Sequence, residues 1–215
     1  MILWPWLTFI GLGAFHGVNP AMGWLFAVAL GLHRQSRAVV LASLLPIAMG
    51  HAVSVGLVAL AVISVDRVVD RRAMGIVSGV ALIGWAAFHW MYRSRHRVRV
   101  GMRTGMLGLA VWSFLMASAH GAGLMLVPAL LPLERVAARH VHSTDHVMSS
   151  GSLGVALAAV GVHSLAMLGV TGVIAVVVYE WVGLAFLRRG WINLDIIWTI
   201  ALVGTGLILF ATARQ

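Results

Sequence analysis

The stretch ILWPWLTFIGLGAFHGVNPAMGWLFAVALGL, residues 2–32, decides the fold because it is apolar throughout and broken once. A straight helix needs about 20 apolar residues to cross a bilayer, so this segment is longer than one crossing requires. The break is Gly17-Val18-Asn19-Pro20, where proline removes a backbone donor and disfavours helical geometry at the residue before it. We therefore predict a membrane helix that is interrupted near its middle.

The rest of the chain has the same apolar character. Of its 215 residues 61% are hydrophobic and 10% charged, with a mean hydropathy of +0.98, whereas roughly a quarter of residues are charged in soluble domains. Five further apolar segments follow, at residues 38–64, 73–92, 105–131, 152–179 and 191–211. None alternates as a barrel strand does, and lipid admits only helices and closed barrels. The sequence predicts an all-α membrane protein with six transmembrane helices.

Charge patterning indicates how the chain sits in the bilayer. All 15 basic residues are arginines and the net charge is +9, but they lie between apolar runs, which favours the lipid bilayer over nucleic acid as partner. The loops between segments one and two, three and four, and five and six hold nine arginines, against six elsewhere. The positive-inside rule then predicts both termini outside, in a bacterial inner membrane. Cysteine is absent, which excludes thiolate and iron–sulfur sites.

Two short motifs recur about half a chain apart. Ala14-Phe15-His16-Gly17 resembles Ser118-Ala119-His120-Gly121, and Gly50-His51-Ala52-Val53-Ser54 resembles Gly161-Val162-His163-Ser164. The fourth segment also carries a break, at Gly121-Ala122-Gly123 and Pro128. Three helices per half is an odd number, so the second copy enters the membrane from the opposite side. We predict two inverted three-helix repeats with broken first helices, residues 1–104 and 105–215, an arrangement typical of secondary transporters.

Four histidines lie deep in the apolar segments, and these are the candidate site: His16, His51, His120 and His163. An ionisable residue at that depth is costly and marks a functional path by default. Brought together at the midplane, four imidazoles suit zinc, nickel, cobalt or copper. Asn19, Pro20, Ser54 and Ser164 are expected to line the path beside them. In the structural alternative, each ring only bonds to a backbone carbonyl.

The apolar segments contain almost no carboxylate, so a divalent ion held there keeps its charge in a low-dielectric interior. Passage of a transition-metal cation as substrate is therefore favoured over permanent binding, although the same imidazoles can also carry protons. A second group of candidate ligands lies in the long loop before the fifth segment and can capture metal at the outer mouth: His140, His142, Asp145 and His146.

The size, the three-plus-three pattern and His16-Gly17-Val18-Asn19-Pro20 resemble the LysE-type exporter superfamily, nearest to the nickel/cobalt transporters of the NicO and urease-accessory kind. That resemblance implies an ion-path role for His16, His51, His120 and His163. The acidic residue and second histidine of those families are missing here, which leaves the identity of the metal open.

No phosphate loop, zinc-protease motif or serine elbow is present, so no enzyme activity is expected. The alternatives are a haem-binding redox subunit and an accessory subunit of a larger complex, and a homo-oligomer is left open.

Overall fold

The computed structural model describes residues 3–66, 70–92, 105–130, 133, 148–182 and 194–213, and every regular element in these ranges is helical. The long elements are α1 (Trp4–Val18), α2 (Trp24–Arg34), α3 (Arg37–Asp66), α4 (Arg71–Tyr92), α5 (Met106–Ala119), α7 (Met148–Val177) and α9 (Leu194–Ala213). Short helical turns complete them: η1 (Pro20–Met22), η2 (Leu124–Leu126) and η3 (Val178–Val182). The prediction of an all-α chain is confirmed for these residues.

Three helical stretches are long and apolar enough to cross a membrane singly: Arg37–Val62, Leu153–Val182 and Ile196–Ala213. A fourth crossing is possible if Met106–Ala119 and Leu124–Leu130, which meet at a bend of 53°, act as one. The apolar part of α4, Arg72–Phe88, is shorter. The described part of the chain is therefore all-helical in its regular structure, and three or four of its helices are able to span a membrane by length and composition.

The predicted interruption of the first segment is confirmed, between α1 and α2. Asn19 has extended backbone angles, as expected of a residue that precedes proline, and Pro20 begins η1. The side chain of Asn19 accepts a hydrogen bond from the amide of Ala21 at 3.0 Å. Gly23 has φ +126°, a conformation that favours glycine, and from it the chain turns into α2. The local sequence thus ends one helix and starts the next.

The second break follows α5. His120 ends that helix, and Gly121 has φ +67°, which again favours glycine. The chain continues through η2 into a helical stretch at residues 127–130. Both breaks therefore combine a histidine at the end of the first helix with a later glycine at positive φ, which is Gly23 at the first break and Gly121, directly after His120, at the second.

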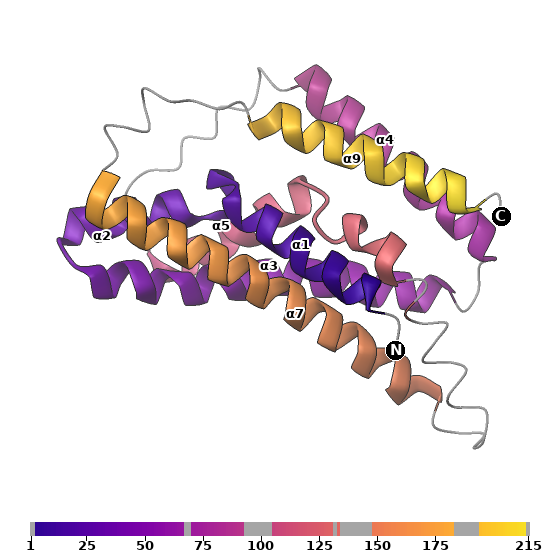
Figure 1. Ribbon diagram of the computed structural model, residues 1–215, viewed down its shortest axis with the longest axis horizontal. Helices are drawn as coiled ribbons and strands as arrows, with labels where there is room; N and C mark the ends of the chain where they lie inside the picture. Colours follow the sequence, from indigo (N-terminus) through magenta and orange to yellow (C-terminus); the bar gives the residue numbers. More distant parts are fainter. Residues whose placement is uncertain are drawn as a thin grey trace.

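Helices from the two halves of the chain pack against each other. α1 lies against α7, α5 against α3, and α4 against α9, while α3 also contacts α7 (Figure 1). In the view of Figure 1 the α4–α9 pair runs along one edge of the molecule. Glycine makes the α1–α7 contact close, because a Cβ on Gly17 would lie 2.6 Å from the carbonyl oxygen of Met167. The helices that carry the candidate site are thus held together across the halves.

Candidate functional site

His16 and His120 occupy matching places at the two breaks. His16 lies in the last turn of α1 and His120 caps α5. The Nδ1–H of His16 donates to the carbonyl oxygen of Leu12 at 2.7 Å, and the Nδ1–H of His120 donates to that of Met116 at 2.8 Å. Since a carbonyl oxygen can only accept, Nδ1 carries the proton and Nε2 keeps its lone pair in both neutral rings. The same local bond therefore fixes the same tautomer at each break.

His51 of α3 and His163 of α7 meet directly. Their Nε2 atoms are 3.2 Å apart, and the Nδ1–H of His163 donates to the carbonyl oxygen of Phe9 on α1 at 3.3 Å. The Nε2 of His163 therefore has a lone pair, and the Nε2–H of His51 donates to it. Three helices, α1, α3 and α7, fix this pair from different directions.

The His16 ring lies beside that pair. Its centroid is 4.9 Å from that of His163 and 5.5 Å from that of His51, and all three residues are fully buried. We refer to His16, His51 and His163 as the histidine triad. Two triad atoms, Nε2 of His16 and Nδ1 of His51, are buried without a hydrogen-bond partner among the described residues. Buried polar atoms are nearly always paired, so these two require an explanation.

His120 joins the triad through an aromatic residue. Trp198 of α9 contacts both rings, with centroids 4.6 Å from His16 and 5.2 Å from His120, and it stacks on Phe15 at 5.2 Å. Three of the four imidazoles that were expected to converge are neighbours, and the fourth, that of His120, contacts Trp198. Within the described ranges no three His, Asp or Glu side chains already converge on one point as metal ligands do.

Tryptophan indoles satisfy carbonyl groups at both breaks, a role that the sequence analysis missed. Each Nε1–H donates to a backbone oxygen: Trp24 to Val18 at 3.1 Å, Trp112 to Ala21 at 3.2 Å, Trp198 to His120 at 2.8 Å, and Trp85 to Ala119. An interrupted helix leaves carbonyl groups without partners, and a buried indole needs an acceptor. Trp24, which follows the predicted break at Pro20 by four residues, was the available signal, and no such signal marks Trp85 or Trp198.

The four residues expected to line the path have different surroundings. Asn19 and Pro20 build the first break, as described above. The hydroxyl of Ser54 on α3 lies 2.8 Å from that of Ser118 on α5, which ties these helices together. Ser164, next to His163, has a buried hydroxyl with no partner among the described residues. The predicted outer ligands His140, His142, Asp145 and His146 lie outside the described residues.

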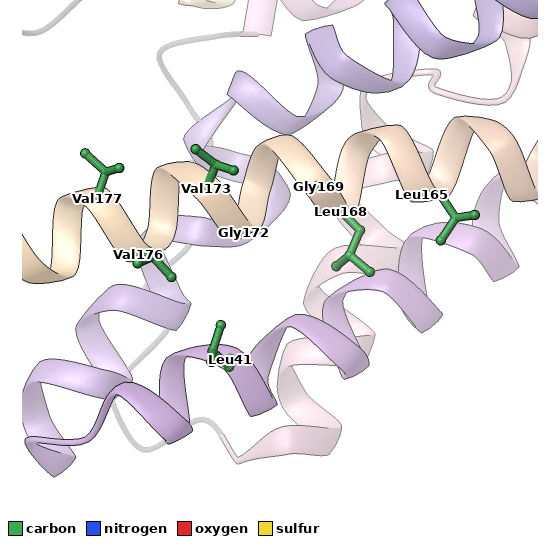
Figure 2. A pocket seen from close by; sticks show the side chains of 8 residues that line it. All are labelled: Leu41, Leu165, Leu168, Gly169, Gly172, Val173, Val176 and Val177. Atoms are coloured by element: carbon green, nitrogen blue, oxygen red, sulfur yellow. The ribbon is translucent and has the colours of Figure 1, made fainter.

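An apolar groove of about 580 Å³ lies between α3 and α7, away from the triad. Leu41 lines it from α3, and α7 contributes the remaining lining residues, from Leu165 to Val177 (Figure 2). At one end of α3 an exposed ion pair joins Arg37 to Glu180 of η3 at 2.9 Å. No histidine lines this groove, so it is not the predicted ion path.

Comparison of the chain with protein-family models, curated proteins and solved structures gives no match. The resemblance to LysE-type exporters therefore stays a prediction, and the function has to be argued from the site itself.

Proposed function

We propose that this protein is a membrane transporter that moves a transition-metal cation through the histidine triad. The observation that carries the proposal is the presence of three fully buried imidazoles that touch one another, two of them with a ring nitrogen that has no partner among the described residues. Ionisable side chains inside a membrane protein are expensive and mark ion paths by default. A packing role alone gives no reason to bury two nitrogen atoms without partners.

Hydrogen bonds to backbone carbonyls prepare the rings as ligands. A metal-bound histidine usually donates its other N–H to a carbonyl or carboxylate, which fixes both tautomer and orientation. His16 and His163 have this arrangement, through Leu12 and Phe9. His51 does not, so its proton can move from Nε2 to the unpartnered Nδ1. The triad would then offer three Nε2 lone pairs.

The spacing of the pair is compatible with a shared ion. Two bonds of about 2.0–2.1 Å that meet at a tetrahedral angle hold their nitrogens about 3.3 Å apart. The Nε2 atoms of His51 and His163 are 3.2 Å apart. The His16 ring is the next candidate ligand, because its centroid lies 4.9 Å from that of His163. It would have to move toward the pair for a third bond, since no three such ligands converge on one point within the described residues.

The pairing of the helices supports two inverted repeats of three crossings each. If α1 corresponds to α5, α3 to α7 and α4 to α9, then α1 on α7 matches α5 on α3, and α4 on α9 is its own match. The shared Nδ1 bond of His16 and His120 agrees with this equivalence. We infer six crossings, two of them broken, with alternating access where the halves meet. The arginine distribution favours a bacterial inner membrane with both termini outside.

Haem binding, the main alternative, has less support. Two axial histidines lie on opposite sides of the iron with the macrocycle between them, so their nitrogens are about 4 Å apart with bonds near 2.0 Å. His51 and His163 contact each other directly at 3.2 Å, which leaves no plane for a porphyrin. The His51–His163 pair therefore does not fit this cofactor.

Flux into proteoliposomes tests the proposed function. The purified chain is reconstituted, and entry of zinc, nickel, cobalt and copper ions is followed with an enclosed fluorescent chelator. We expect flux of at least one ion, lost at least tenfold in His51→Ala and in His163→Ala. His33→Ala, at an exposed position of α2, is the matched control and should keep it. Equal flux in protein-containing and empty liposomes for every ion would contradict transport and favour an accessory role.

A further inference from the structure

We propose that the cation held by the histidine triad is monovalent and soft, Cu(I), with Ag(I) as its closest analogue. This inference rests on the proposed transport function and names its substrate class. Three independent features of the site carry it: the charge of the ligands, their number, and the groups packed around them.

The first feature is charge. The described contacts of the triad are imidazole rings, aromatic rings and backbone carbonyls, and no carboxylate is among them. Glu180, whose side chain is described, pairs with Arg37 at the helix ends instead. The cost of transferring an ion from water to a low-dielectric interior rises with the square of its charge. In a site of neutral ligands, the transfer free energy is therefore about four times as unfavourable for a divalent ion as for a monovalent ion of similar size.

The second feature is the number of ligands. One pair of Nε2 atoms has converged, His16 is the next candidate, and within the described residues no fuller ligand set is gathered. Zinc in proteins takes four ligands, or three with a water molecule in the open position. Cu(I), which has a filled d shell, is stable with two or three. The triad can supply that number without a water molecule or an anionic residue. Three bonds of about 2.0 Å in one plane hold their nitrogens about 3.5 Å apart, so the Nε2 atoms of His51 and His163, now 3.2 Å apart, would separate by about 0.3 Å.

The third feature is the softness of the surroundings. The indole of Trp198 packs against His16, and aromatic rings attract a desolvated cation. Met167 is fully buried on α7 one helical turn after His163, and Met22 and Met125 are buried in the core cluster that contains Trp198. Thioether and imidazole groups suit Cu(I), whereas carboxylate and water suit harder ions. The indole in contact with His16 therefore favours a soft monovalent ion.

Metal competition on the full chain tests the proposal. The background is His140→Ala/His142→Ala/His146→Ala, which removes the loop histidines that can bind metal independently. The protein in detergent is titrated without oxygen against a coloured Cu(I) chelator, and in parallel with Ag(I), Zn(II), Ni(II) and Co(II). We expect one Cu(I) per chain, displaced by Ag(I), with an affinity at least 100-fold above that of any divalent ion. His51→Ala should weaken Cu(I) binding at least 100-fold, and His33→Ala should leave it unchanged.

X-ray absorption of the Cu(I)-loaded protein gives a readout that needs no triad variant. We expect two or three nitrogen scatterers at about 2.0 Å. Four or more atoms bound directly to the copper, or sulfur atoms alone, would overturn the assignment. A divalent ion bound as tightly as Cu(I), and lost in His51→Ala, would refute the monovalent cargo and leave the proposed transport intact. Absence of binding by every metal would refute both.

Discussion

Four tryptophans complete the backbone hydrogen bonding that the helix breaks leave open. At a surface, water could replace the indole as donor to a backbone carbonyl. The carbonyl of His120 instead accepts from the buried indole of Trp198 on α9. The same indole contacts the rings of His16 and His120. At the scale of single residues, Trp198 is therefore both a partner of the backbone and a wall of the candidate site.

Trp198→Phe should destabilise the protein by about 1–3 kcal/mol, because it removes the indole donor from the carbonyl oxygen of His120. The measurement is equilibrium unfolding in detergent micelles. Trp181→Phe is the control, since Trp181 is 82% exposed, and its effect should stay within about 0.5 kcal/mol. Equal effects of the two substitutions would show that the bond to His120 contributes nothing.

At the scale of elements, small residues allow the helices that carry the triad to approach closely. Gly13 and Gly17 of α1 face the backbone of His163 and Met167 on α7, and Gly50 of α3 faces that of Ala110 on α5. The spacing Gly13-xxx-Gly17 predicts such a contact, and the structure confirms it. This approach brings His16 on α1 next to His163 on α7.

Gly17→Ala should lower stability by about 1–3 kcal/mol, because the added methyl group would lie 2.6 Å from the carbonyl oxygen of Met167 and force α1 away from α7. Gly11→Ala, in the same helix with nothing within 4 Å of the new methyl group, should be neutral or raise stability by up to about 1 kcal/mol. Thermal unfolding of both variants in micelles checks the difference. A Gly17→Ala protein as stable as the Gly11→Ala protein would contradict the close contact.

Sequence patterns predicted the local features of the site better than its assembly. Asn19-Pro20 specifies the first break by itself, and so the position of His16 at the end of a helix was predictable. The contact of His51 with His163 was expected only from their equivalence in the repeat. The place of Trp198 was not predictable, because it depends on how α9 packs, and no local pattern encodes a contact 78 residues away from His120. The loop histidines stay a prediction.

At the scale of the whole molecule, each half of the chain depends on the other for its packing. α1 lies on α7 and α3 on α5, so neither half contains the main partner of its own first helix. The triad also draws His16 and His51 from the first half and His163 from the second. The candidate site therefore exists only when both halves are present.

Residues 1–104 and 105–215, expressed as two separate chains in one cell, should associate and co-purify through a tag on either one. Each half expressed alone should aggregate or be degraded, because its helices lack their partners. Gly50→Leu should reduce the recovered partner several-fold by blocking the α3–α5 contact, and Gly56→Leu, where nothing lies within 4 Å, should not. This packing would be contradicted if each half were stable and monodisperse alone and the two did not co-purify.

The packing of α1 on α7 also determines when α1 can reach its native contact during synthesis of the chain. The last residue of α1 is Val18 and α7 begins at Met148, so about 130 residues are synthesised between them. At ribosomal speeds of about 5–20 residues per second, the first helix waits on the order of 10 s before its partner exists. During that interval the glycine face of α1 is covered by lipid or by the insertion machinery. Helix α1 can therefore pack on α7 only after most of the chain has been synthesised.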